Sequence, residues 1–192
     1  PELYSWVKRA TFQRALPHAL RMSDHIIATS EATKNEIVHI LKARTDNITV
    51  IHSGIDEAFR PTADERLLHR VQKRYGITTP YILTVGTLDR RKNLQTLIQA
   101  YHMLIQDKDP GCALVIVGQK GNGHLELMRA IAERNLEKRI HLLGYVEEED
   151  LPILYSGARL FVSSSRYEGY GFPALEALAC GTPILSSPSP SI

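Results

Sequence analysis

The sequence is poor in cysteine and has no long apolar run. It contains only two cysteines, Cys112 and Cys180, which form neither a disulfide framework nor a metal-ligand spacing. Isolated cysteines are typical of proteins kept in a reducing cytosol, so we expect a cytoplasmic protein. No stretch approaches the ~20 consecutive apolar residues that a membrane helix needs.

A concentrated charge of one sign is also lacking. The net charge is +2, and the charged residues are spread along the chain. A nucleic-acid-binding domain would need a basic patch on one face, so we expect no nucleic-acid partner. The hydrophobic content of 43% is sufficient for a proper core.

Short strands rich in Val, Ile and Leu alternate with helices along the chain. Strands are predicted over residues 25–29, 48–51, 81–85, 113–117, 140–143, 160–162 and 183–185, and helices over 4–22, 31–41, 64–75, 94–106, 125–134, 148–156 and 173–180. Pro17 is expected to kink or interrupt the first helix. This alternation predicts an α/β fold with a Rossmann-like parallel sheet and helices on both faces.

The segment 53–61 is polar and broken by glycine and proline, which indicates a linker. We therefore predict that residues 1–55 are the tail of an N-terminal domain and that residues 56–192 form a second domain. Both ends of the sequence look like the middle of a longer one. We expect a piece of a larger protein, with the second domain incomplete at its end.

Ligands of open α/β sheets bind outside the carboxyl ends of the strands. Four loops are predicted there, each with glycine at or near its start: Gly86–Asn93, Gly118–Gly123, Gly144–Val146 and Ser163–Phe172. The first loop contains three consecutive cations, Arg90, Arg91 and Lys92. This arrangement predicts an anionic, phosphate-bearing ligand.

The last of these loops leads into a helix. Pro173 suits the first helical position, with Glu168 in the loop and Glu176 about one turn into the helix. The positive end of the helix dipole would face the ligand. Gly169-x-Gly171-x-x-Ala174 also fits a dinucleotide fingerprint, but no Asp or Glu follows Glu176, where that fingerprint expects an acidic residue ~20 positions on.

The stretch from Glu168 to Pro183, Glu-Gly-Tyr-Gly-Phe-Pro-Ala-Leu-Glu-Ala-Leu-Ala-Cys-Gly-Thr-Pro, closely resembles the two-glutamate donor motif of retaining GT-B glycosyltransferases, in glycosyltransferase family 4. Similarity runs over nearly the whole chain and is strongest from Tyr81 to Leu185. The resemblance implies the donor-nucleotide domain of a retaining glycosyltransferase, preceded by the tail of the acceptor domain. It also implies that this chain alone is inactive.

The resemblance implies roles for individual residues. Glu168 would lie near the donor sugar, and Glu176 would bind the ribose hydroxyls. The diphosphate would meet Gly86, Thr87, Arg91, Lys92 and Gly118, the base would meet Tyr145 and Val146, and the backbone of Gly169, Tyr170, Gly171 and Phe172 would offer N–H groups to sugar and phosphate. Many family members have arginine where this chain has Thr87, and whether Arg90 or Arg91 replaces that cation stays open.

We expect no metal ion. Asp107-Lys108-Asp109 is formally an Asp-x-Asp motif, but it lies before the start of a predicted strand, at the wrong edge of the sheet. The eight histidines show no ligand spacing. Lys92, a nearby arginine and the helix N-terminus would instead neutralise the leaving diphosphate.

The expected substrates are thus a GDP- or UDP-sugar, as in mannosyltransferases, and an unknown carbohydrate or lipid-linked acceptor. Contact with the inner face of a membrane stays open for the missing N-terminal part. Three alternatives also remain. They are a non-catalytic nucleotide-binding or regulatory module, an NAD-type dehydrogenase and a sugar-nucleotide epimerase of GT-B shape. The dehydrogenase would need an acidic residue on the ribose, and this sequence has none at the expected position.

Overall fold

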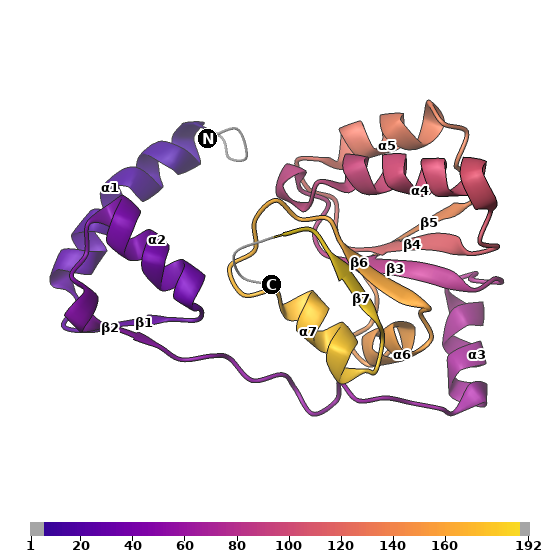
Figure 1. Cartoon of the computed structure of the whole chain (residues 1–192), viewed down its shortest axis with the longest axis horizontal. Coiled ribbons are helices and arrows are strands. Elements are labelled where there is room, and N and C mark those ends of the chain that lie inside the picture. The colour runs from indigo at the N-terminus through magenta and orange to yellow at the C-terminus, as the bar shows by residue number, and fades with distance from the viewer. Residues whose placement is uncertain (1–5, 189–192) are drawn as a thin grey trace. The chain divides into compact units, whose positions relative to one another are not determined.

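The computed structural model describes residues 6–188, with side chains for residues 10–188 (Figure 1). Within them the chain forms two compact units. The first comprises residues 6–54 together with 167–171, and the second comprises residues 55–166 and 172–188. Each unit is described by itself.

The first unit is small and mainly helical. It contains α1 (Trp6–Met22), β1 (Ile26–Ala28), α2 (Glu31–Leu41), the 3₁₀ helix η1 (Thr45–Asn47) and β2 (Ile48–Val50). The two strands pair in parallel, with Ile26 opposite Ile48. Ser30 is the N-cap of α2, because its side chain accepts a hydrogen bond of 3.1 Å from the backbone N–H of Thr33.

The interruption of α1 considered at Pro17 does not occur. The helix continues through Pro17 to Met22. A proline removes the hydrogen bond to the carbonyl four residues earlier, which here belongs to Gln13. Since Gln13 is exposed, water can bind that carbonyl.

The second unit is a five-stranded parallel sheet between two layers of helices. Its strands are β3 (Tyr81–Val85), β4 (Ala113–Val117), β5 (Ile140–Gly144), β6 (Leu160–Ser163) and β7 (Ile184–Ser186), in the order β5-β4-β3-β6-β7. Helices α4 (Leu94–Lys108) and α5 (His124–Ala132) cover one face, and α3 (Glu65–Arg74), α6 (Leu151–Ser156) and α7 (Phe172–Ala179) cover the other (Figure 1). The α/β fold with a parallel sheet and helices on both faces is therefore confirmed.

The core follows from the alternation of side chains along the strands. Leu83 lies in register with Val115 and Phe161, and all three are buried under α3, α6 and α7. Their neighbours Leu114 and Ile116 are buried under α4 and α5. Every residue of β4 is buried, as expected for a strand covered on both faces.

The helix predicted over 148–156 is shorter than expected. α6 begins at Leu151, because Pro152 has no N–H that could bond the carbonyl of Glu148. Asp150, which precedes the helix, accepts hydrogen bonds from Arg74 (2.6 Å) and Tyr75 (2.9 Å) of the α3 region. Pro152 also favours a helix start at this point.

The strand order fixes where a ligand can bind. From β3 the chain continues to β4 and β5 on one side, then returns to β6 and β7 on the other. The order therefore reverses between β3 and β6. In open α/β sheets the crevice at the carboxyl ends of such a strand pair is the ligand site.

Candidate functional site

The loop after β3 contains a buried lysine. Lys92 ends the short 3₁₀ helix η2 (Arg90–Lys92), and its side chain is only 7% exposed. A Cβ atom added to Gly86 would lie 2.5 Å from Lys92 Cε and 2.8 Å from Nζ. The lysine side chain thus lies against the end of β3, at the ligand edge of the sheet.

The loop after β6 supports this lysine from the other side of the switch point. Ser164 Oγ donates a hydrogen bond of 2.8 Å to the carbonyl of Lys92. The N–H of Arg166 donates one of 2.9 Å to the carbonyl of Arg91. The two loops at the switch point are therefore joined through η2.

The glycines that start the first three loops are in backbone contact with one another. Gly86 N donates to Val117 O and Gly118 N donates to Gly144 O, each at 2.8 Å. A Cβ on Gly118 would lie 2.0 Å from Gly86 O, and Gly118 has φ +150°. Only glycine allows this approach, which explains why glycine follows β3 and β4.

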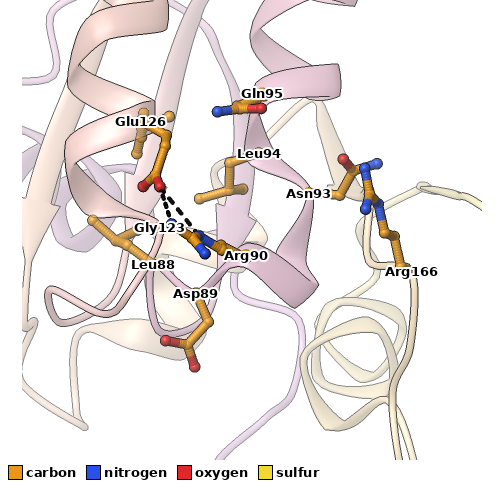
Figure 2. Close-up of a pocket in the computed structure, with 10 residues that line it drawn as sticks. Leu88, Asp89, Arg90, Asn93, Leu94, Gln95, Gly123, Glu126 and Arg166 are labelled. Atoms are coloured by element: carbon orange, nitrogen blue, oxygen red, sulfur yellow. Dashed lines mark hydrogen bonds and ion pairs between the residues drawn. The ribbon is translucent and has the colours of Figure 1, made fainter. Parts of the chain in front are cut away.

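The three cations of the first loop differ in exposure. Arg90 is exposed and forms an ion pair with Glu126 of α5, with Nη2 2.5 Å from Oε1 (Figure 2). The hydrogen bond from Arg90 is the main cause of a lowered Glu126 pKa. Arg91 is half-buried and Lys92 buried. Arg90 is therefore engaged with α5, away from the lysine side chain over Gly86.

A cavity of about 240 Å³ lies beside that ion pair. It is lined by residues of η2, α4 and α5 together with Arg166 (Figure 2). Among the cations considered for the diphosphate, only Arg90 lines this cavity, and Arg90 is paired with Glu126. The cavity is also smaller than the roughly 300–1,000 Å³ of typical small-molecule sites. This cavity is not the predicted donor site.

Glu176 lies on α7, within the second unit. Its Oε2 accepts a hydrogen bond of 2.7 Å from the hydroxyl of Tyr155. Burial raises the pKa of Glu176, while the Tyr155 hydrogen bond and the positive charge of Lys92 act to lower that pKa. The carboxylate and the ammonium group therefore influence each other electrostatically at one edge of the sheet.

The residues predicted to meet the base and the first phosphate differ in exposure. Tyr145 is 59% exposed and Thr87 is exposed, whereas Val146 is 5% exposed and packs in the core. Val146 can therefore offer a ligand only its backbone. Phe172, predicted in the loop, is instead the first residue of α7, with Pro173 at the second position.

The predicted donor loop around Glu168 belongs to the first unit, where Glu168 is 7% exposed. The carbonyl of Gly169 accepts hydrogen bonds from Ser30 Oγ (3.0 Å) and Thr33 Oγ1 (3.2 Å). The peptide before Tyr170 is thereby anchored to the start of α2.

Tyr170 is anchored as well. Its hydroxyl donates to the carbonyl of Ser53 at 2.7 Å, and its ring stacks on His52, with centroids 6.0 Å apart. Neither Ser30 nor His52 was among the predicted site residues. No sequence pattern indicated that either lies beside this loop.

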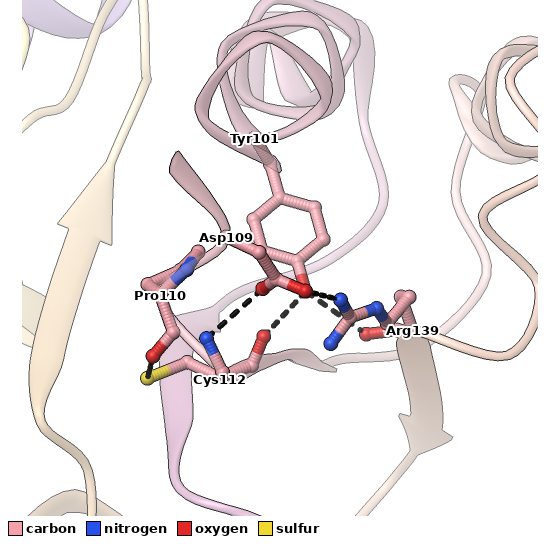
Figure 3. A network of polar contacts seen from close by, with 6 residues as sticks. Tyr101, Asp109, Pro110, Cys112 and Arg139 are labelled. Carbon is pink, nitrogen blue, oxygen red and sulfur yellow. Dashed lines mark hydrogen bonds and ion pairs between the residues drawn. The ribbon is translucent and has the colours of Figure 1, made fainter. Parts of the chain in front are cut away.

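The Asp-x-Asp motif is engaged in structural contacts. Asp109 accepts a hydrogen bond from Gly111 N (2.9 Å) and pairs with Arg139 (Figure 3). These two contacts, the Gly111 bond first, lower the pKa of Asp109. It lies between α4 and β4, at the edge opposite the ligand site, as predicted. Asp107 is part of α4.

Within the described residues, no group of three or more His, Cys, Asp or Glu side chains could hold a metal ion. Nor does any helix in that part of the chain have the length and apolar character needed to cross a bilayer.

Comparisons with known proteins agree with the fold. Sequence similarity extends to O-antigen chain mannosyltransferase B of Escherichia coli, 32% identical over 187 residues, and mannosylfructose-phosphate synthase of Agrobacterium fabrum, 31% identical over 182 residues. The matches cover 97% and 90% of this chain but only 49% and 40% of these relatives. The chain thus spans about half the length of the curated relatives it matches, or less.

The crystal structure of Anabaena Alr3699/HepE in complex with UDP and glucose has a similar fold. The TM-score is 0.80 at 23% identity, over 94% of this chain and 49% of that one. The family model of glycosyltransferase family 4 matches residues 1–59, and that of glycosyl transferases group 1 matches residues 68–192. The resemblance read from the glutamate motif is confirmed: the chain belongs to the glycosyl transferases group 1 family.

Proposed function

We propose that the full-length protein transfers a sugar from a nucleotide-diphosphate sugar to an acceptor with retention of the anomeric configuration, and that this chain supplies the donor-binding half. The main support is the pair formed by Lys92 over Gly86 and Glu176 held by Tyr155, at the carboxyl edge of a Rossmann-like sheet. The similarity to glycosyltransferases supplies the reaction class.

We assign the diphosphate to the loops after β3 and β4. Lys92 would bind a phosphate oxygen, with backbone contacts at Gly86, Thr87 and Gly118. Arg90 is paired with Glu126, and we assign Arg91 as the second cation on the strength of the resemblance. Together with the N-terminus of α7, these cations would stabilise the leaving diphosphate without a metal ion.

We assign the nucleoside to Glu176 and to the segment after β5. Glu176 would accept hydrogen bonds from the ribose hydroxyls. Tyr145 is exposed and would contact the base with its ring, while Val146 would use only its backbone.

We assign the donor sugar to the loop that contains Glu168. Glu168 would lie beside the transferring sugar, and the backbone N–H groups of Gly169, Tyr170, Gly171 and Phe172 would face sugar and phosphate. The anchoring of Gly169 by Ser30 and Thr33 supports this role, because an ordered peptide is a preorganised donor.

The names of the similar proteins support the expected donor without fixing it. One relative is a mannosyltransferase and one solved structure holds UDP and glucose, so a GDP- or UDP-sugar is proposed. Residues 1–55 would belong to the acceptor domain and 56–192 to the donor domain, in a cytoplasmic enzyme. Because catalysis would need both domains, we expect this chain alone to transfer no sugar.

A thermal-shift panel of UDP-, GDP- and ADP-sugars on the full-length protein tests the donor. The matching donor should raise the melting temperature, and Lys92→Ala should abolish that rise. A transfer assay with candidate acceptors, followed by NMR of the product's anomeric proton, then tests retention. A product of inverted configuration contradicts the mechanism, and binding without transfer to any acceptor favours the non-catalytic module.

A further inference from the structure

Tyr155 is held rigidly in the core below the proposed ribose site. Its side chain is fully buried. Its ring lies 6.0 Å from Phe59 in an edge arrangement and 5.7 Å from Phe161 in a tilted one. Its backbone carbonyl accepts a hydrogen bond of 2.6 Å from Thr182 Oγ1. Both the ring and the backbone of this residue are therefore fixed by neighbours.

The one polar atom of this side chain meets Glu176. The hydroxyl lies 2.7 Å from Glu176 Oε2. Burial is the main cause that raises the pKa of Tyr155, so the phenol stays protonated and donates the hydrogen bond. A carboxylate has about four lone-pair sites. Tyr155 occupies one of these sites.

Without the hydrogen bond from Tyr155, the Glu176 side chain could adopt more rotamers. Glu176 is half-buried on α7, and long side chains lose about 1.5–2 kcal/mol of rotamer entropy when they are fixed. A rigid donor from the neighbouring helix α6 restricts the carboxylate before any ligand arrives. Preorganisation of this kind raises affinity by reducing the ordering that binding requires.

We propose that Tyr155 is a positioning residue that holds the Glu176 carboxylate in place for the ribose hydroxyls of the donor nucleotide, and so contributes to the preference for a ribonucleotide. The inference rests on the proposed donor site. Tyr155 itself is buried beneath Glu176 and is assigned no contact with the ligand.

The test compares Tyr155→Phe with the wild type in the full-length protein. Affinities for UDP and GDP, each with its 2′,3′-dideoxy analogue, are measured by calorimetry. Phe preserves the ring packing and removes only the hydrogen bond. We expect affinity for the better ribonucleotide to fall about three- to tenfold, the range for one hydrogen bond. Affinity for its dideoxy analogue should stay unchanged.

Thr182→Val provides a matched control. It removes a buried hydrogen bond to the backbone of the same tyrosine and leaves the phenol in place. This variant should lower the melting temperature without changing the ratio between ribonucleotide and dideoxynucleotide affinities. If the ratio changes in Tyr155→Phe and not in Thr182→Val, lost stability does not explain the change.

The pH dependence gives a second readout. The groups that act on the Glu176 carboxylate are Tyr155 from α6 and Lys92 from η2. The Cys180 thiol lies just beyond α7, and its pKa is raised mainly by burial and also by the charge of Glu176. Because the Tyr155 hydrogen bond lowers the Glu176 pKa, its removal should raise that pKa further. The pH below which ribonucleotide affinity is lost should therefore move upward in Tyr155→Phe.

The possible outcomes separate this inference from the proposed function. If Glu176→Ala abolishes the ribose preference but Tyr155→Phe keeps both the preference and the pH profile, the donor site stands and the role of Tyr155 is refuted. Equal losses for ribo- and dideoxynucleotides in Tyr155→Phe also refute it. If Glu176→Ala keeps the preference, the proposed ribose site itself is wrong.

Discussion

The end of the Lys92 side chain lies against the backbone of Gly86. A Cβ atom at position 86 would come within 2.5 Å of Lys92 Cε and 2.8 Å of Nζ. Gly86 also has φ +143°, a conformation that residues with side chains rarely adopt. Glycine at 86 is therefore required both by the backbone conformation and by the space that the lysine fills.

Lys92→Ala should weaken binding of a nucleoside diphosphate far more than binding of the bare nucleoside. The proposed ammonium–phosphate contact is a charged hydrogen bond, and such bonds contribute about 1.5–3 kcal/mol, so a ten- to hundredfold loss is expected. Calorimetric titration with UDP, GDP and the corresponding nucleosides measures the difference. Equal losses for both ligand types would mean that Lys92 does not bind the phosphates.

Arg90→Ala is the matched control, since it removes a cation from the same 3₁₀ helix. Arg90 is paired with Glu126 on α5, so its loss should leave diphosphate affinity within about twofold, a typical effect of substitutions away from a site. A loss as large as that of Lys92→Ala would show that Arg90, and not Arg91, replaces the cation missing at Thr87.

Gly118→Ala should destabilise the second unit. The new methyl group would lie 2.0 Å from Gly86 O, and neither backbone can move without breaking the hydrogen bonds at the ends of β3, β4 and β5. Backbone strain alone costs about 1–3 kcal/mol. Urea denaturation should reveal the loss, with Gly54→Ala as a control because nothing lies within 4 Å of its added Cβ. Similar stabilities for the two variants would contradict the tight contact.

The strands were the most predictable part of the fold. β3 and β4 match their predicted bounds because each is a buried apolar run flanked by Pro or Cys on one side and Gly on the other. The surroundings of α6 show both cases. Its start at Leu151 follows from Pro152, which has no N–H for the Glu148 carbonyl, whereas the bonds that Asp150 accepts from Arg74 and Tyr75, more than seventy residues away, had no sequence signal.

The candidate site likewise combines features that the sequence predicts with contacts that it does not. Glycine-led loops at the carboxyl edge followed from strand alternation alone, because parallel strands put their ends together. The contacts of Lys92 with Gly86, of Tyr155 with Glu176 and of Ser30 with Gly169 had no sequence signal, since each depends on packing. The functional roles of all these residues stay predictions.

Asp109→Asn should leave donor affinity unchanged. Asp109 is engaged by Gly111 N and Arg139 between α4 and β4, at the edge of the sheet opposite the proposed site. Its substitution should slightly lower the melting temperature through the loss of these contacts.

The activity of the full-length protein should survive removal of metal ions by EDTA. Loss of activity in EDTA with rescue by manganese would contradict the proposed metal-independent mechanism.

Substitutions of Glu176 and Glu168 should affect different kinetic parameters of the full-length enzyme. The ribose that we assign to Glu176 is the same in the ground state and the transition state, so Glu176→Ala should mainly raise the donor KM. The sugar that we assign to Glu168 changes its charge during transfer. Glu168→Ala should therefore mainly lower kcat, by about 10²–10³ if the contact equals one oxyanion-hole donor.

The burial of Glu168 makes a control for folding necessary. Because its side chain is only 7% exposed, removing it can also disturb the loop that contains Gly169 and Tyr170. Glu168→Gln keeps the size of the side chain and removes only its charge. If the charge matters in the transition state, Gln should lower kcat nearly as much as Ala, with a melting temperature near that of the wild type. A Gln variant with wild-type kcat would mean that Glu168 has a structural role only.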